Sequence, residues 1–341
     1  MIKNEDIKKV ENIKFNEDTY TIRWNVTKIC NYNCDFCIQG NRKKHLEDSK
    51  GESYELRKKI CDNIIEFIET KINKKFSKLR IYLIGGEVTI LKEFIEILEK
   101  FSNCKFEGTM EIHITTNLSC SKKTLEKIKT IVKENKNKKY IRNIEISASY
   151  YKQFTTEKEF IRQIKTLRKN NLLNYISKKH RLKSNFRIKL TYPLITDEDY
   201  KKYLIFKIKN LIYADGIGYI YIRNYKKEIS PKLKEKLSKK NKTYRMKVTM
   251  KNNEVYYFKT PSEIKFLTEN NEPFNPYGMI CDTGIYNISI SNVGVISRCP
   301  SCSKKTEIGS IFDKNIDLIT KPTCCPSYKC DCSFSKKIER K

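Results

Sequence analysis

Along the first two thirds of this 341-residue chain, short stretches with every second residue apolar alternate with longer stretches whose apolar residues recur every three or four positions. The first pattern is typical of β-strands and the second of amphipathic helices. Six strands are expected, at Thr21–Thr27, Arg80–Ile84, Glu111–Asn117, Asn143–Ser149, Arg187–Tyr192 and Ile217–Ile222. Helices are expected between them, at Ser53–Lys74, Thr89–Phe101, Lys122–Glu134, Glu157–Asn170 and Asp197–Tyr213. This alternation predicts an α/β fold with a parallel sheet and right-handed crossovers.

The segments that flank this alternation have simpler patterns. Ile7, Val10 and Ile13 are spaced as on one side of a helix, so a short leading helix is expected before the first strand. After the last strand, two alternating segments at 244–250 and 254–259 lie on either side of an Asn-Asn pair, which predicts a β-hairpin.

The chain is strongly basic, with 70 Lys and Arg against 40 Asp and Glu and a formal net charge of +30. Such a charge favours polyanions such as RNA. However, the lysines are spread along the chain, and we see no signature of an RRM or KH domain. We therefore interpret the charge as compositional, although a basic surface still attracts acidic ligands.

Thirteen cysteines are many for a chain of this length. The N-terminus is polar and has no signal-peptide core, and no apolar run approaches the roughly 18 residues of a membrane span. We therefore expect a cytoplasmic protein without a membrane partner, whose cysteines bind metal in a reducing compartment rather than form disulfides.

Three of these cysteines, Cys30, Cys34 and Cys37, lie within eight residues. A tight loop can bring three thiolates together as metal ligands. Closed structural zinc sites take four protein ligands, and no fourth Cys or His follows nearby, His45 being the closest candidate. A 4Fe-4S cluster held by three thiolates keeps one iron open for a substrate or cofactor. The alternative is three free cysteines in a reduced cytosol.

The spacing Cys-x3-Cys-x2-Cys, with the aromatic Phe36 before the last cysteine and a strand before the first, resembles the signature of the radical S-adenosylmethionine (SAM) superfamily. The resemblance implies a partial (β/α)6 barrel whose first strand leads into the cluster loop. It also implies that Gly85-Gly86-Glu87 holds the amino group of SAM. Strand ends would supply further cofactor contacts, at Asn117, Ser147 and Ser149. His113 lies in mid-strand and is expected to be a core or solvated histidine.

Seven cysteines follow in the last 61 residues: Cys281, Cys299, Cys302, Cys324, Cys325, Cys330 and Cys332. Cys281, a predicted hairpin around 291–294 and Cys299 resemble the opening of the SPASM or twitch extension of radical SAM enzymes, which carries auxiliary clusters. The later spacing departs from the SPASM pattern, so we expect one auxiliary 4Fe-4S cluster. Its expected ligands come from Cys281, Cys299, Cys325, Cys330 and Cys332. A structural zinc ribbon is the alternative, because spacing alone does not separate zinc from iron.

These expectations define three predicted parts: a core barrel with a leader (1–225), a connector with a hairpin (226–277) and a Cys-rich auxiliary-cluster domain (278–341). The resemblance implies that SAM chelates the open iron of the cluster held by Cys30, Cys34 and Cys37. An electron from a flavodoxin- or ferredoxin-type donor then cleaves SAM, and the 5′-deoxyadenosyl radical takes a hydrogen atom from a substrate.

The substrate is not identified by the sequence. The twitch-like tail favours a peptide or protein, the charge favours RNA, and a small metabolite is a further alternative. A different function class is a non-catalytic iron-sulfur or zinc protein that binds RNA. The Gly85-Gly86-Glu87 segment argues against it, because a binding module needs no clamp for methionine.

Overall fold

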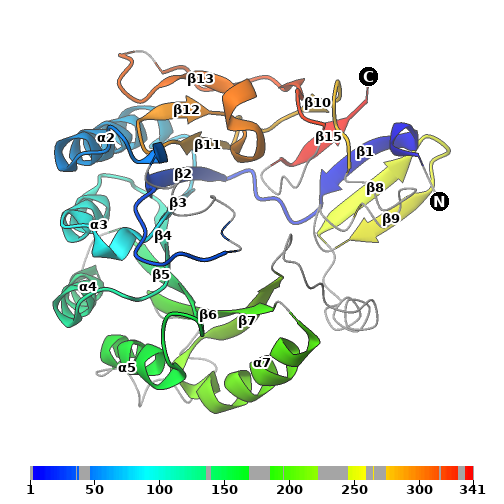
Figure 1. Ribbon diagram of the computed structural model, residues 1–341. Helices are drawn as coiled ribbons and strands as arrows, with labels where there is room; N and C mark the ends of the chain where they lie inside the picture. The colour runs from blue at the N-terminus through cyan, green and yellow to red at the C-terminus, as the bar shows by residue number, and fades with distance from the viewer. Residues whose placement is uncertain are drawn as a thin grey trace. The chain divides into compact units, whose positions relative to one another are not determined.

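The computed structural model describes residues 3–35, 37, 47–135, 140–168, 185–194, 196–221, 245–258, 264, 274–314, 316–328 and 335–340. The chain divides into two compact units, Trp24–Lys239 and a second one made of Met1–Arg23 with Lys240–Lys341 (Figure 1). No described helix is long and apolar enough to span a membrane.

The unit Trp24–Lys239 is built on strands that follow one another in the sheet in chain order. They are β2 (Thr19–Thr27), β3 (Lys78–Gly85), β4 (Thr109–Thr116), β5 (Arg142–Ser149), β6 (Phe186–Leu194) and β7 (Gly216–Tyr221). From β3 to β7 each neighbouring pair is parallel. The expected α/β fold and its six strands are confirmed, and β2 passes from the second unit into this one at Trp24.

The helices of this unit lie on the outer side of the curved sheet (Figure 1). They are α2 (Tyr54–Phe67), α3 (Phe94–Asn103), α4 (Lys122–Glu134), α5 (Glu157–Arg168) and α7 (Asp197–Asn210). Ser53 and Ser121 cap α2 and α4 by accepting bonds from backbone N–H groups. The expected helix from Thr89 starts later, at Phe94, because residues 88–90 form a 3-10 turn.

Alternation along the strands separates an apolar outer face from a polar inner face. Leu79, Ile81 and Leu83 of β3 are fully buried, whereas Lys78 and Arg80, which alternate with them in sequence, lie on the other face. The same alternation continues along β4, β5 and β6. The inner face therefore carries charged and polar side chains where a closed barrel would be filled with apolar ones.

The second unit contains an antiparallel sheet in the order β14-β10-β15-β1-β8-β9. Its strands are β1 (Ile7–Asn12), β8 (Met246–Met250), β9 (Val255–Phe258), β10 (Ile280–Cys281), β14 (Thr323–Cys324) and β15 (Lys337–Glu339). The hairpin expected at 244–259 is confirmed as β8 and β9.

The leading helix expected near Ile7 is wrong, because Ile7–Asn12 is strand β1, paired with β8 and β15. A register shift between Ile7 and Lys9 adds one residue to β1. This irregularity lets Ile7 and Val10, three residues apart, both enter the core. The three-residue spacing of Ile7 and Val10, which is typical of a helix, is therefore produced here by a strand with a bulge.

A second antiparallel group in this unit consists of β11 (Asn287–Ile290), β12 (Val295–Ser297) and β13 (Glu307–Ser310). The expected hairpin around 291–294 is confirmed as β11 and β12, with Gly294 at φ +88° in the turn. The amide of Thr21, in the first part of β2, donates to the Tyr286 carbonyl at 2.9 Å. The three domain boundaries stay a prediction.

Candidate active site

The end of β2 and the end of β3 are joined by backbone hydrogen bonds immediately before the first cysteine of the loop. The Gly86 N–H donates to the Thr27 carbonyl at 2.7 Å, and the Glu87 N–H donates to the Ile29 carbonyl at 2.8 Å. A Cβ at Gly85 would lie 2.2 Å from the Thr27 oxygen, and one at Gly86 would lie 2.1 Å from the Ile29 oxygen. Glycine is therefore required at both positions, and it sets Glu87 directly beside the cysteine loop.

A buried ionic network fixes the same end of β2 from the other side. The Glu52 carboxylate accepts from the Thr27 hydroxyl at 2.5 Å and from the Lys28 N–H at 2.7 Å. Arg57, on α2, bridges Glu52 at 3.1 Å to Glu93, which precedes α3. Since these side chains are almost fully buried, the network anchors the start of the cysteine loop to two helices.

The three thiols of the loop, Cys30, Cys34 and Cys37, are partly buried and lie within electrostatic reach of one another. The Cys37 N–H donates to the Cys34 carbonyl at 3.0 Å, which closes a turn between these two residues. Burial, with smaller contributions from neighbouring thiols, raises the pKa of Cys30 and raises that of Cys34 to about 12. A positive metal centre would reverse this and keep both as thiolates.

Glu87 is 1% exposed and is surrounded by neutral donors. Its Oε1 accepts from the Thr89 N–H at 3.0 Å, from the Thr89 hydroxyl and from the Thr116 hydroxyl at 2.6 Å. Its Oε2 accepts from the Asn117 N–H at 2.5 Å. Burial raises the pKa of Glu87, and these hydrogen bonds only partly oppose it. Among the described residues, no cationic side chain is a hydrogen-bond partner of this carboxylate.

Asn117 connects the end of β4 to the cysteine loop. Its side-chain N–H donates to Asn31 Oδ1 at 3.2 Å, and Asn31 in turn donates to the Ser119 hydroxyl at 2.9 Å. Asn117 was expected to contact the cofactor, and that contact stays a prediction. What the structure shows is its bonding to the loop itself and to Glu87.

Aromatic residues after β5 pack against the loop residue Tyr32. Its ring stacks on Phe154 at 4.5 Å and meets Tyr151 edge-on at 6.3 Å. Burial raises the pKa of Tyr151 to about 12, while a hydrogen bond with Ser149 lowers it. Ser149 is thereby linked to the loop, and Ser147 lies two residues further back on the same face of β5.

Several predicted site residues lie outside the described residues: Phe36, His45, Cys330 and Cys332. Among the described residues, Cys281, Cys299 and Cys325 are all buried in the hydrophobic core of the second unit. Cys325 lies close to the start of β10, because its N–H donates to the carbonyl of Met279, the residue before that strand, at 2.8 Å. Cys324, which was not expected to be a ligand, is exposed.

No group of three or more His, Cys, Asp or Glu is arranged around a metal position within the ranges that the structure describes. The three tail cysteines nonetheless share one core, and the three loop cysteines share one turn-containing segment. The ligand sets for both groups stay predictions.

Sequence reasoning missed Glu52, Arg57 and Asn31. Glu52 and Arg57 act through partners 24 and 36 residues away, and no local pattern reports such pairs. Asn31 could have been found from the sequence, since it is a polar residue inside the cysteine motif, just after the end of the predicted strand.

Part of the chain is similar to GTP 3′,8-cyclases. It is 30% identical over 103 residues to the enzyme of Haemophilus influenzae strain PittEE, which is 30% of this chain and 27% of that protein. It is 28% identical over 116 residues to a probable GTP 3′,8-cyclase of Saccharolobus solfataricus, which is 34% of this chain and 33% of that protein. The chain therefore matches a third or less of the length of these relatives.

Among solved structures, the chain is similar to the crystal structure of Streptococcus suis SuiB bound to precursor peptide SuiA. The TM-score is 0.50 at 16% identity, over 86% of this chain and 63% of that chain. A likeness at this identity concerns the fold. The radical SAM superfamily itself matches residues 24–204, more than half of the chain. With its three-cysteine loop and the paired glycines beside it, the chain belongs to the radical SAM superfamily.

Proposed function

We propose that Cys30, Cys34 and Cys37 hold a 4Fe-4S cluster whose open iron binds SAM, and that the protein uses this pair to modify a substrate by hydrogen abstraction. When bound, the pair supplies one-electron cleavage of SAM to a 5′-deoxyadenosyl radical. Family membership implies SAM and a 4Fe-4S cluster. The observation that carries the proposal is the pair of backbone bonds that sets Glu87 beside the loop of three thiols.

The surroundings of Glu87 fit the amino group of SAM. A buried carboxylate with a raised pKa and only neutral donors is stabilised when a cation binds to it. Oε1 already accepts three hydrogen bonds and Oε2 one, so Oε2 has the greater remaining capacity for an ammonium group. Asn117, Ser147 and Ser149 would complete the SAM site from neighbouring strand ends.

We also propose an auxiliary 4Fe-4S cluster held by Cys281, Cys299 and Cys325, with Cys330 or Cys332 as a further ligand. The burial of the first three in one core supports this proposal. Two clusters predict about eight irons per chain, and a triple Cys30/Cys34/Cys37→Ala variant should keep about four. One zinc and no iron in that variant would favour the zinc ribbon.

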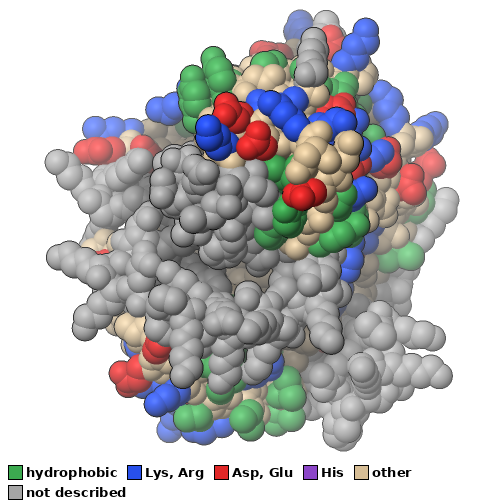
Figure 2. All heavy atoms as spheres, turned by 90° about the vertical axis from the view of Figure 1, so that its right-hand side faces the viewer, with side chains coloured by type: hydrophobic (Ala, Val, Ile, Leu, Met, Phe, Trp, Pro, Cys, Tyr) green, Lys and Arg blue, Asp and Glu red, His purple; other side chains and the backbone are tan. Residues whose placement is uncertain are grey.

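For the substrate we favour a peptide or protein, with a flavodoxin or ferredoxin as electron donor. The twitch-like tail supports this choice, and SuiB, of similar fold, is known in complex with a precursor peptide. Modification of RNA is the second candidate. On the face that Figure 2 shows, the described Lys and Arg side chains are interspersed with Asp and Glu.

The test is formation of 5′-deoxyadenosine from SAM by the anaerobically reconstituted and reduced chain. Cys34→Ala should abolish the product, because an iron ligand is lost. Cys61→Ala is the matched control, since Cys61 is a buried thiol that packs within α2 and should keep the product. Full product formation by Cys34→Ala would refute the proposal.

A further inference from the structure

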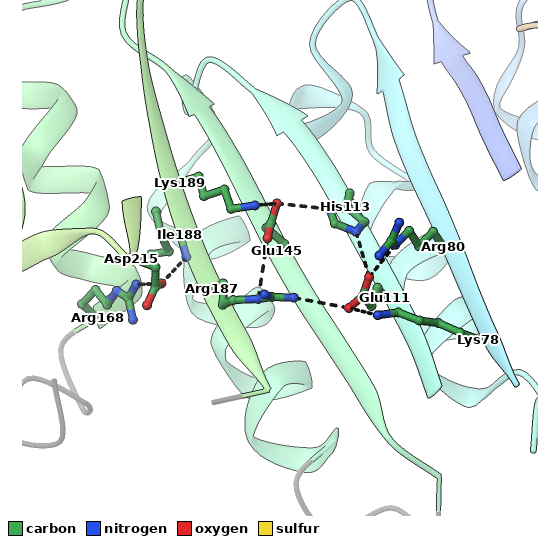
Figure 3. Close-up of polar contacts among 10 residues, drawn as sticks. All are labelled: Lys78, Arg80, Glu111, His113, Glu145, Arg168, Arg187, Ile188, Lys189 and Asp215. Atoms are coloured by element: carbon green, nitrogen blue, oxygen red, sulfur yellow. Dashed lines mark hydrogen bonds and ion pairs between the residues drawn. The ribbon is translucent and has the colours of Figure 1, made fainter. Parts of the chain in front are cut away.

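The inner face of the sheet carries a group of basic side chains that the proposed SAM site does not use. They are Lys78 and Arg80 on β3 and Arg187 and Lys189 on β6 (Figure 3). Their side chains are between 26% and 50% exposed, so their charged ends reach solvent. The presence of several basic side chains on one face of the sheet needs a physical explanation.

Two buried carboxylates hold these basic groups in place. Glu111 of β4 contacts Lys78 at 2.8 Å, Arg80 at 2.8 Å and Arg187 at 3.4 Å. Glu111 is only 10% exposed in its side chain. Although burial alone would raise the pKa of Glu111, its hydrogen bonds with His113, Lys78 and Arg80 hold it well below the usual range.

Glu145 of β5 holds the basic side chains on the other side of the group. It contacts Lys189 at 2.9 Å, His113 at 3.2 Å and Arg187 at 3.6 Å. Burial would raise the pKa of Glu145, but the bonds from His113 and Lys189 lower it to about 2. Both carboxylates therefore stay ionised and hold the basic side chains in position.

The charges of this group do not balance. Among the described residues of the group, four basic side chains contact two carboxylates, an excess of two positive charges. His113 lies between the carboxylates with its ring stacked on Tyr82 at 4.5 Å, and its Nε2 is 3.7 Å from Glu111. Preorganised cations in excess of their counterions are the usual means of binding an oxyanion.

The basic group lies on the same face of the sheet as the proposed active site, but nearer to the N-terminal ends of the strands. Strand register pairs Ser147 with Lys189 and Glu145 with Arg187. Ser149 is linked to the cysteine loop through Tyr151. Glu145 lies four residues before Ser149 on β5, which corresponds to roughly 13 Å of strand at about 3.3 Å per residue. A substrate could therefore present one end to the loop while its other end reaches the basic group.

We propose that Lys78, Arg80, Arg187 and Lys189 bind a compact oxyanion, phosphate or carboxylate, of the substrate, with Glu111 and Glu145 as positioning residues. The proposal rests on the proposed function in one respect, namely that the anion belongs to the molecule that is modified.

The test is calorimetric titration of the anaerobically reconstituted full chain with two probes, inorganic pyrophosphate and succinate, at one ionic strength. The test variant is Arg80→Gln/Lys189→Gln. The matched control is Lys123→Gln/Lys127→Gln, which removes the same charge from exposed positions on α4. Saturable binding of one probe per chain is expected for wild type and control, with at least tenfold weaker binding for the test variant. The preferred probe identifies phosphate or carboxylate.

Equal binding by the two double variants, or no saturable binding by wild type, would overturn the proposal. The single variant Lys189→Gln guards against misfolding, because that side chain is half exposed, and it should weaken binding severalfold without a change in melting temperature. The 5′-deoxyadenosine assay on the same samples separates the two proposals. Anion binding without SAM cleavage would leave this site standing while the proposed function fails, and cleavage without anion binding would do the reverse.

Discussion

Glu87 and Glu145 are both buried glutamates of the same unit, yet their surroundings move their pKa values in opposite directions. Glu87 follows β3 at the cysteine loop and accepts hydrogen bonds from neutral donors only, so burial dominates and its pKa rises. Glu145 lies in mid-strand, where His113 and Lys189 outweigh burial and lower its pKa to about 2. Among the described residues, no cationic side chain bonds to Glu87, whereas four basic side chains contact Glu111 and Glu145.

This difference suggests two halves of one reaction site. In the two proposals above, the Glu87 carboxylate binds the ammonium group of SAM, and the group of basic side chains binds an anionic part of the substrate. The comparison can be tested by removing each charge in turn.

The largest effect is expected at Glu87. Glu87→Gln keeps the shape of the side chain but removes the charge, and losing the partner of a buried ammonium costs about 2–5 kcal/mol. SAM binding, measured by equilibrium dialysis, should weaken at least tens of times, while the iron content is kept. Glu96→Gln, on the surface of α3, is the control. If Glu87→Gln binds SAM as wild type does, the clamp is wrong.

A smaller effect is expected from the glycine that joins the two strand ends. Gly86→Ala places a methyl group 2.1 Å from the Ile29 carbonyl, and overpacking of this kind costs about 1–3 kcal/mol. Gly218→Ala is the control, because a Cβ there meets nothing within 4 Å. Denaturant unfolding should show a lower midpoint for Gly86→Ala only. A midpoint equal to that of the control would show that the close approach carries no strain.

The smallest effect concerns His113. Burial lowers its pKa, but the interactions of its ring N–H groups with the Glu111 and Glu145 carboxylates outweigh burial and raise it. A raised pKa in the folded state means that His113 stabilises the fold fully below the unfolded value of about 6.5 and loses this contribution as pH rises through the folded pKa. The stability difference between wild type and His113→Gln should therefore shrink from pH 5 to pH 9. A difference that grows with pH would contradict the network.

The fold and the family could be predicted from the sequence because both depend on local residue patterns. Period-two and helical alternation marked the six strands, and cysteine spacing with paired glycines marked the superfamily. The leading helix failed because a bulge in β1 imitates helical spacing. His113 was expected to be a core or solvated residue; its side chain is 11% exposed, and the sequence did not indicate the ionic network around it, whose members come from four strands.

Long-range partners explain the rest of what was missed. Glu111 and Arg187 meet although 76 residues separate them, and Glu52 reaches Lys28 across 24. Such pairs depend on the order and register of the strands and on helix placement, which residue patterns do not encode. The strand ends were predictable as a site, whereas the charged group further along the strands was not.

The most direct test of the central claim is electron–nuclear double resonance on the reduced chain with SAM isotopically labelled at the amino nitrogen. The account predicts a hyperfine coupling between that nitrogen and the cluster held by Cys30, Cys34 and Cys37. The coupling should weaken or vanish in Glu87→Gln. A wild-type cluster signal that shows no coupling to the labelled nitrogen, and no change when SAM is added, would contradict the claim that this loop binds SAM.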